Sequence, residues 1–315
     1  MKILITGGTG FIGRELIKLL MTHDLVVLTR NAAQAKAKLA HIQNERLDFL
    51  ESLEELHDLN TFDAVINLAG EPIADKRWTS AQKQRICDSR WKLTEKLVEL
   101  IHASAKPPHV LISGSAVGYY GDQQDHPFDE SLQVKSSRFS HHVCETWEEI
   151  ALHAQSDRTR VCLLRTGVVL APEGGALKKM LPPYRLGLGG PIGNGQQYMP
   201  WIHMCDMVRG IVFLLETEHA QGAFNLCAPH PVSNLIFSRS LAATLKKPHV
   251  LTTPQWAIRL LMGEASELLF DSIRAKPKKL TELGFQFTYS RIEGALGLLA
   301  VDMRLDLSYA DGEIS

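Results

Sequence analysis

The chain has 315 residues, of which 45% are hydrophobic and 22% are charged. This is enough to bury the core of one large domain or of two interlocked domains, and it excludes disorder throughout the chain. The net charge of −1 excludes a global basic field that would attract nucleic acid or an anionic membrane, so we expect neither as a partner.

The first predicted elements are a short buried strand, a glycine turn and a helix, all within residues 2–13. Gly7 and Gly8 allow a sharp turn after the strand, Gly10 lets the backbone approach phosphates, and Gly13 lets the helix pack closely on the sheet. The start of the helix would hold a dinucleotide pyrophosphate on its free N–H groups. The alternative is a turn with a packing role only. The expected cofactor contacts are Gly7, Gly10, Phe11, Ile12 and Gly13.

The choice of cofactor is predicted from the end of the second strand, residues 25–28. An acidic residue there would bond the ribose 2′-OH of NAD, whereas this chain has Arg30, which can bind a 2′-phosphate bidentately and stack on adenine. We therefore expect NADP, with NAD as the less favoured alternative. Arg14 and Asn31 could reach the same phosphate. Arg14 could equally be a solvated helix residue, and Asn31 is the expected cap of a helix over residues 31–40.

Strand and helix patterns then alternate, which predicts an α/β fold with a Rossmann-type, doubly wound parallel sheet. After Arg165 the chain becomes rich in glycine and proline over residues 172–195, and we expect a substrate-covering loop region there. The remaining elements are expected as strands at 63–69, 109–113, 160–166 and 223–227, helices at 80–103, 137–153 and 204–215, and mostly helical structure over 235–299.

The same pattern divides the chain into two parts. We expect a dinucleotide-binding domain over residues 1–166, to which residues 200–227 return. A smaller, partly discontinuous C-terminal substrate domain is expected over residues 167–199 and 228–300, followed by a loosely held tail over 301–315.

Two strand ends are candidates for ligand contact because ligands of open α/β sheets bind at the carboxyl ends of strands. Leu68, Ala69 and Gly70 end one buried strand with small residues and could pass under the cofactor ribose, although a tight packing bend is nearly as good an interpretation. Ser115 follows the next strand and is the preferred substrate-contacting hydroxyl.

Four segments carry a family resemblance: Asn67-Leu-Ala-Gly-Glu-Pro-Ile, Gly114-Ser-Ala-Val-Gly-Tyr-Tyr-Gly, Arg165-Thr-Gly-Val-Val-Leu and Trp201-Ile-His-Met-Cys-Asp. They resemble the atypical extended short-chain dehydrogenase/reductase family of NAD-dependent, nucleotide-sugar epimerase-like proteins. The resemblance implies an extended Rossmann domain and a C-terminal helical domain of unknown function from about Val250. Arg165, at the start of the third segment, is included among the expected cofactor-binding residues.

The chain departs from the wider superfamily at the Tyr-x-x-x-Lys pair, in which an ammonium group lowers the pKa of a phenol that exchanges a proton with substrate. These two positions hold Ser140 and Cys144. Tyr119 or Tyr120, close after Ser115, could replace the missing donor. Further candidates are Glu145, Cys144 and His142, although such carboxylates and histidines on a helix surface are usually solvated.

Other residues suggest an anionic ligand. Residues 187–195 could wrap a diphosphate or sugar through backbone N–H groups, with Trp201 and His203 at the edge of the cleft. Asp206 is expected to cap the following helix. A set of basic residues on and before helix 80–103 could meet an anion or form a solvated face: Arg77, Lys83, Arg85 and Arg90.

Two functions follow from these observations. The first is an NADP(H)-dependent oxidoreductase or epimerase acting on a carbinol or carbonyl carbon of an anionic small molecule, perhaps a nucleotide sugar. The second is a non-catalytic NADP(H)-binding regulatory or sensor protein. The five cysteines form no C-x-x-C pair, which argues against a disulfide framework or a structural metal site. No signal peptide or spanning run is recognised, so a cytoplasmic protein is expected.

Overall fold

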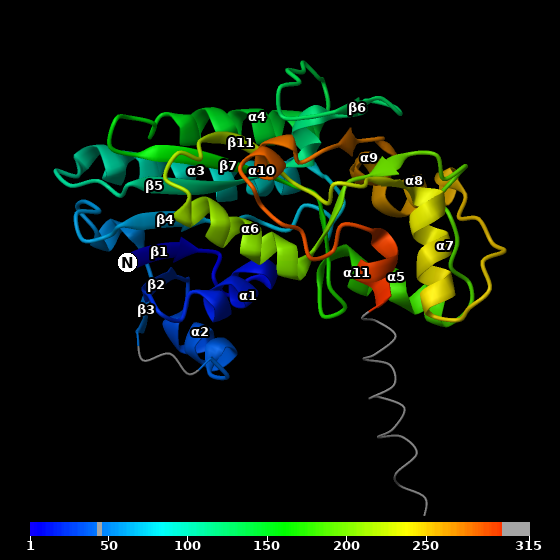
Figure 1. The fold of residues 1–315 in the computed structure, drawn as a ribbon, viewed down its shortest axis with the longest axis horizontal. Coiled ribbons are helices and arrows are strands. Elements are labelled where there is room, and N and C mark those ends of the chain that lie inside the picture. The colour runs from blue at the N-terminus through cyan, green and yellow to red at the C-terminus, as the bar shows by residue number, and fades with distance from the viewer. Residues whose placement is uncertain (43–45, 298–315) are drawn as a thin grey trace, which may run out of the picture.

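The computed structural model describes residues 1–42 and 46–297 (Figure 1). Its centre is a seven-stranded, all-parallel sheet in the order β11-β7-β5-β4-β1-β2-β3. This confirms the predicted Rossmann-type fold. The strands are β1 (Lys2–Thr6), β2 (Asp24–Leu28), β3 (Leu47–Leu50), β4 (Ala64–Asn67), β5 (Val110–Ala116), β7 (Arg160–Thr166) and β11 (Gly222–Leu226).

Helices cover both faces of this sheet. Alternation along β1 sends Ile3 and Ile5 into a core shared with α1 and α6, while Leu4 enters a core shared with α3 and α4. Figure 1 shows these two helix pairs on opposite sides of the sheet. The helices are α1 (Phe11–Leu19), α2 (Ala32–Leu39), α3 (Ser80–Ala103), α4 (Phe139–Leu152) and α6 (Met204–Glu216).

A second lobe is built around its own apolar core, in which Trp201 and Phe237 are fully buried and to which α5, α7, α11, β8 and β10 contribute. Three short two-stranded sheets lie outside the central sheet: β10 with β8, β12 with β9 and β13 with β6. The other helices are α5 (Gly175–Arg185), α7 (Asn234–Thr244), α8 (Gln255–Met262), α9 (Glu267–Phe270), α10 (Lys278–Glu282) and α11 (Ile292–Gly297). Figure 1 shows α8 and α9 in the second lobe, whereas Leu280 of α10 lies in the core shared with α1 and α6. The short strands are β6 (Pro127–Phe128), β8 (Val168–Leu170), β9 (Tyr198–Met199), β10 (Trp201–His203), β12 (Val232–Ser233) and β13 (Arg274–Ala275).

Several expected boundaries are confirmed, including helix 80–103 as α3 and strand 160–166 as β7. The edge strand β3 was not predicted, because its four residues give little periodicity. The interpretation of residues 172–195 as loop is wrong over α5, which contains Pro182 and Pro183. The predicted tail lies outside the described residues. Among the described residues, no helix is both long and apolar enough to span a membrane.

Candidate functional site

The glycine turn between β1 and α1 leaves no room for side chains. Gly7 has φ of +71°, and a Cβ there would lie 2.7 Å from the Leu68 backbone. A Cβ on Gly13 would lie 2.3 Å from the Gly7 carbonyl oxygen, so this glycine allows the helix to pack against the turn. Gly10 is the N-cap of α1 and has no side-chain cap, which leaves the first-turn N–H groups available for an anion.

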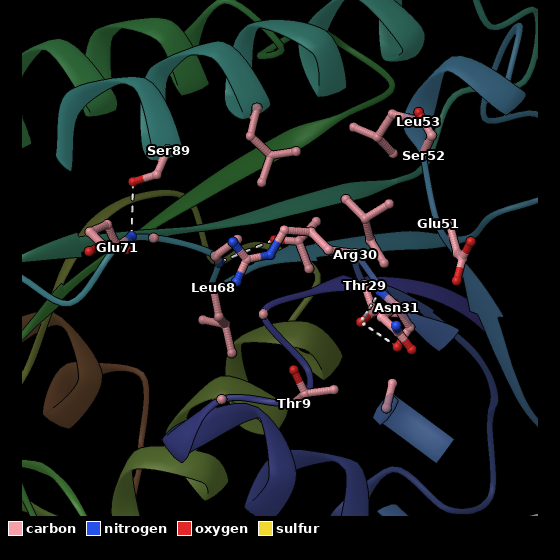
Figure 2. A pocket seen from close by; sticks show the side chains of 18 of the residues that line it. Thr9, Thr29, Arg30, Asn31, Glu51, Ser52, Leu53, Leu68, Glu71 and Ser89 are labelled. Atoms are coloured by element: carbon pink, nitrogen blue, oxygen red, sulfur yellow. Dashed lines mark hydrogen bonds between the residues drawn. The ribbon is translucent and has the colours of Figure 1, made fainter. Parts of the chain in front are cut away.

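A cavity of about 740 Å³ opens beside this turn (Figure 2). Its walls are the glycine turn, the ends of β2 and β3, residues 68–72 and one face of α3. Arg30 extends from the end of β2 across the cavity toward Leu68. Among the described residues, Arg30 is exposed and has no recorded hydrogen-bond or ion-pair partner. An exposed guanidinium on a cavity wall is suited to an external anion.

The other residues proposed for the phosphate have protein partners. The Asn31 side chain caps α2 by accepting from the Gln34 N–H at 2.8 Å. Arg14 Nε donates to the Gly10 carbonyl at 3.4 Å, and Arg14 is not among the cavity-lining residues. Glu51, which the sequence interpretation missed, also lines the cavity and accepts from the Ala32 N–H at 2.7 Å. This carboxylate follows the unpredicted strand β3.

Residues 68–70 line the cavity as expected. The Ala69 N–H donates to Thr6 Oγ1 at 3.2 Å, and Thr6 in turn donates to Asn67 Oδ1 at 2.6 Å. The Arg90 guanidinium lies directly over Gly70, where a Cβ would be 2.8 Å from Arg90 Cζ. Arg90 also donates to the Glu71 carbonyl oxygen at 3.0 Å, so this cation holds residues 70–71 in place and is not a free anion ligand.

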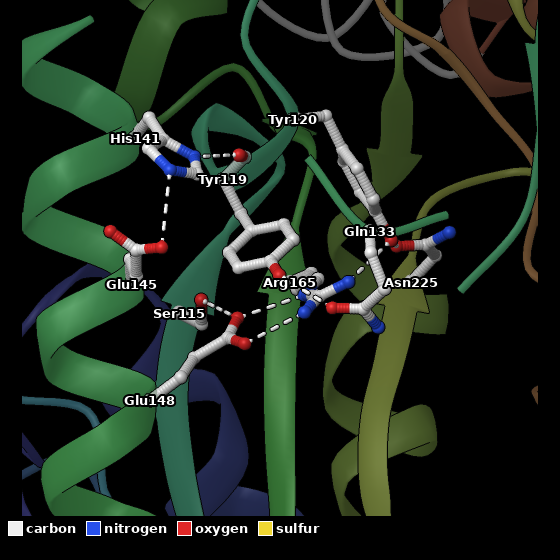
Figure 3. Close-up of polar contacts among 9 residues, drawn as sticks. All are labelled: Ser115, Tyr119, Tyr120, Gln133, His141, Glu145, Glu148, Arg165 and Asn225. Atoms are coloured by element: carbon white, nitrogen blue, oxygen red, sulfur yellow. Dashed lines mark hydrogen bonds and ion pairs between the residues drawn. The ribbon is translucent and has the colours of Figure 1, made fainter. Parts of the chain in front are cut away.

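Ser115 lies in a buried polar network between α4 and the strands of the central sheet (Figure 3). Its hydroxyl donates to Glu148 Oε1 at 2.6 Å. Arg165 forms a two-pronged ion pair with the same carboxylate, from Nε to Oε1 at 2.8 Å and from Nη2 to Oε2 at 2.7 Å. Burial lowers the pKa of Arg165, but the hydrogen bonds and charge of Glu148 outweigh it and hold this pKa above its ordinary value. Glu148 therefore connects the candidate hydroxyl to a permanent cation.

Tyr119 and Tyr120 belong to the same network, but neither phenol is activated. Tyr120 donates to Asn225 Oδ1 at 2.7 Å and accepts from Arg165 Nη1 at 2.9 Å. Tyr119 donates to Gln133 Oε1 at 3.3 Å, and its ring stacks on Arg165 with 3.5 Å between the guanidinium carbon and the ring centre. Burial raises the pKa of both phenols, the opposite of what the missing Tyr–Lys pair achieves.

The alternative donors on α4 are also held by neighbours. Burial raises the pKa of the Cys144 thiol to about 11, so it is protonated at neutral pH. Glu145 pairs with His141 at 3.5 Å, and His142 packs edge-on against Trp91. In the place of the usual tyrosine, Ser140 donates from its hydroxyl to Glu267 Oε1 at 2.9 Å. Glu267 comes from α9 in the second lobe, and this contact was not predicted from the sequence.

Arg165 lies away from the 740 Å³ cavity and is only 4% exposed, so its expected contact with the cofactor has no counterpart in the cavity wall. It lines a second cavity of about 550 Å³ instead, between α4, β11 and α10. Tyr119, Glu145 and Glu148 face the same space. The Ser115 network therefore borders this second cavity through its carboxylate and its cation.

Several sequence-based expectations outside these cavities are wrong. Trp201 is fully buried in the second core and cannot stack on a ligand. His203 caps α6 by accepting from the Cys205 N–H at 3.2 Å, so Asp206 is not the cap. Asp206 accepts instead from the backbone N–H groups of Thr288 and Tyr289, at 2.9 and 2.8 Å.

The glycines of residues 187–195 and Lys83, on α3, also have contacts within the protein. A Cβ on Gly190 would overlap the Leu251 carbonyl oxygen at 1.7 Å, and the loop runs against residues 248–255 and lines neither cavity. Lys83 pairs with Glu264 at 2.6 Å. No group of His, Cys, Asp and Glu among the described residues has the arrangement of a metal site.

Comparison with known proteins defines the class. Residues 3–227 match the NAD-dependent epimerase/dehydratase family, and residues 253–299 match a domain of unknown function, DUF1731. The chain belongs to this epimerase/dehydratase family, which confirms the resemblance found in the sequence.

Individual relatives support the same family assignment. An epimerase family protein of Staphylococcus haemolyticus is 36% identical over 295 residues, covering 93% of this chain and 96% of that protein. The crystal structure of human epimerase family protein SDR39U1 with NADPH is 31% identical with a TM-score of 0.85, covering 96% of this chain and all of that one. A nucleoside-diphosphate sugar epimerase from Corynebacterium glutamicum is 28% identical with a TM-score of 0.72, covering 98% of this chain and 61% of that one.

Proposed function

We propose that the protein is an NADP(H)-dependent enzyme that oxidises, reduces or epimerises a carbinol or carbonyl carbon of a small anionic molecule in the cytoplasm. The observation that carries the cofactor assignment is the unpartnered Arg30 on the wall of a cavity beside the glycine turn. A guanidinium there favours a 2′-phosphate, whereas an acid would repel it. The human relative solved with NADPH supports the same cofactor.

The residues present fit such a cofactor. Gly7 has no space for a Cβ, Gly10 leaves the backbone open to a pyrophosphate, and the uncapped start of α1 offers it N–H groups. Leu68 and Ala69 supply the opposite wall. When bound, a nicotinamide dinucleotide supplies a hydride donor or acceptor. The protein supplies orientation and the groups that hold the reacting oxygen.

For the reacting oxygen we assign Ser115, with Glu148 as its partner. The Ser115 hydroxyl can hold a substrate oxygen, and Glu148 can take or return the serine proton because its carboxylate is the acceptor of that hydroxyl. Arg165 holds this carboxylate in position through two hydrogen bonds. This relay needs neither the tyrosine nor the lysine that the wider superfamily uses, and it leaves Tyr119 and Tyr120 as support for Arg165.

A non-catalytic NADP(H)-binding protein is the second candidate. Its support is the presence of Ser140 and Cys144 where the superfamily has tyrosine and lysine, together with protein partners for every phenol and carboxylate of the Ser115 network. In this alternative, cofactor binding would change the contacts between α4 and the second lobe, such as that of Ser140 with Glu267, and no substrate would be converted.

The experiment that separates the two is NADPH-dependent turnover across nucleotide sugars and small carbonyl compounds, with nucleotide sugars first because of the Corynebacterium glutamicum relative. We expect turnover that falls at least a hundredfold in Ser115→Ala and Glu148→Gln, while NADPH affinity is kept. Ser240→Ala, on α7, is the matched control. Unchanged turnover in Ser115→Ala would remove the assigned role, and no turnover on any substrate with intact NADPH binding would favour the second candidate.

A further inference from the structure

The charge of the chain is unevenly distributed. Residues 174–205 and 219–263 contain no aspartate or glutamate, although the whole chain has a net charge of −1. These two stretches include α5, α7 and α8, which lie together at the end of the molecule away from the N-terminus (Figure 1). They carry seven basic residues: Lys178, Lys179, Arg185, Arg239, Lys246, Lys247 and Arg259. The second lobe is therefore cationic on a nearly neutral protein, a local property that the net charge hides.

The same lobe exposes large apolar side chains. Helix α8 buries none of its residues, and Trp256, Leu260 and Leu261 are 70%, 70% and 72% exposed. Trp256 and Leu260 are four residues apart and so share one face of the helix. Isolated apolar side chains on a surface are normal, whereas a helix with no buried residue and three exposed large ones is not.

The exposed apolar residues continue from α8 into two adjacent segments. Residues 186–193 run beside residues 248–255, joined by the bridge between Ile192 and Thr253 and by the hydrogen bond from the Gly193 N–H to the Thr253 carbonyl at 2.9 Å. Pro254 leads directly into α8. We name the exposed large apolar residues of these three segments the α8 surface: Leu186, Leu188, Val250, Leu251, Trp256, Leu260 and Leu261.

Basic residues flank the α8 surface in the chain. Arg185 directly precedes Leu186, Lys246 and Lys247 precede Val250, and Arg259 lies within α8. Arg259 stacks near the Phe270 ring, and the other three have no recorded ion-pair partner among the described residues. The acid next to α8, Glu264, is already paired with Lys83. No free carboxylate in these segments would repel an anionic surface.

We propose that the α8 surface docks onto an anionic lipid bilayer, with the apolar side chains entering the headgroup region and the flanking cations facing the lipid phosphates. An amphipathic helix with tryptophan and leucine on one face and basic neighbours is the type of element that lies in a membrane interface. Charge complementarity favours this partner, because exposed cations flank the α8 surface and the three segments that form it contain no acid. The proposal does not depend on the proposed enzyme activity.

The test is binding of the full chain to phosphatidylcholine vesicles with and without phosphatidylglycerol. Of the five tryptophans, all in described residues, only Trp256 is classed as exposed, so its emission should shift to the blue and be quenched by brominated lipid. Lys246→Gln with Lys247→Gln should weaken binding to the anionic vesicles about thirtyfold, since each cation near such a surface contributes about fivefold. Leu260→Ser with Leu261→Ser should weaken it at least tenfold.

The matched controls are Leu19→Ser, on α1, and Lys36→Gln with Lys106→Gln, none of which belongs to the lobe. These should bind vesicles as the wild type does, and NADPH affinity, as a check of folding, should be unchanged in all variants. Equal binding to neutral and anionic vesicles, or none, would overturn the proposal. A further contradicting outcome is a wild type that does not bind vesicles but self-associates in sedimentation, with self-association lost in the Leu260→Ser, Leu261→Ser variant. A second copy of the chain would then cover this surface.

Discussion

The two polar regions of the candidate site differ in whether their side chains already have partners. At the cavity beside the glycine turn, Arg30 is exposed and has no hydrogen-bond or ion-pair partner among the described residues, and the start of α1 has no side-chain cap. In the network between α4 and the central sheet, Ser115, Glu148 and Arg165 are bonded to one another and buried. The first region offers a guanidinium and N–H groups that could take an external anion, whereas the polar side chains of the second are already paired with one another. Mutation at the first region should therefore reduce ligand binding without loss of stability, whereas mutation in the second region should reduce stability.

The largest effect on stability is expected in the buried network. Glu148→Leu leaves Arg165 as an unpaired cation that is 4% exposed, which should lower the free energy of unfolding by about 3–5 kcal/mol. Chemical denaturation at neutral pH measures this loss. Glu148→Gln keeps the shape and part of the hydrogen bonding, so it should lose less. A Glu148→Leu variant as stable as the wild type would show that the ion pair between Glu148 and Arg165 does not stabilise the fold.

At the glycine turn, binding should be lost without loss of the fold. Gly10→Val places branches where the backbone must approach a pyrophosphate, and NADPH affinity should fall at least a hundredfold, about 3 kcal/mol. A Cβ at Gly10 meets only the Gly7 carbonyl oxygen, at 3.0 Å, so circular dichroism should be unchanged. Gly13→Ala is the contrasting variant, because its Cβ would be 2.3 Å from the same oxygen and should destabilise the protein. Normal NADPH binding by Gly10→Val would mean that the turn does not hold the cofactor.

A smaller effect is expected from pH at the start of α4. Asp271 lies beside Arg138, and burial raises the pKa of its carboxyl from 3.8 to about 6. Because the folded state holds this proton more tightly than the unfolded state, the contribution of Asp271 to stability falls as pH rises from about 4 to 6. Asp271→Asn removes this dependence. Its stability relative to the wild type should rise by about 1 kcal/mol between pH 4.5 and pH 7, allowing for solvent screening. A constant difference in denaturation across this range would contradict the assignment.

The sequence predicted the strand, turn and helix at the start of the chain better than the contacts of α4, for a physical reason. The strand, turn and helix around Gly7 and Gly13 are adjacent in the chain, so their chemistry could be interpreted locally. Ser115, Glu148 and Arg165 lie on β5, α4 and β7, and a carboxylate on a predicted helix gives no signal of the partner it will meet in the fold. The spacing of Glu148 four residues after Cys144 was the available clue, because it places both near one side of α4.

Local pattern also failed where burial decides the role of a residue. Trp201 suggested a stacking surface, but a large apolar side chain fits a core equally well, and here it is fully buried. Glycines 187–195 suggested a phosphate loop and instead allow contact with residues 248–255. The exposed α8 surface was hidden for the opposite reason, since a whole-chain charge of −1 averages over the acid-free stretches 174–205 and 219–263.

The proposed NADP(H) site, in which Arg30 binds the 2′-phosphate, is tested most directly by titration of NADPH and NADH against the wild type and Arg30→Asp. Arg239→Asp, at an exposed arginine of α7, is the control. We expect tighter binding of NADPH by the wild type, a loss of about 1.5–3 kcal/mol for NADPH in Arg30→Asp with little change for NADH, and no change in the control. Equal affinity of the wild type for the two cofactors would contradict the proposed site.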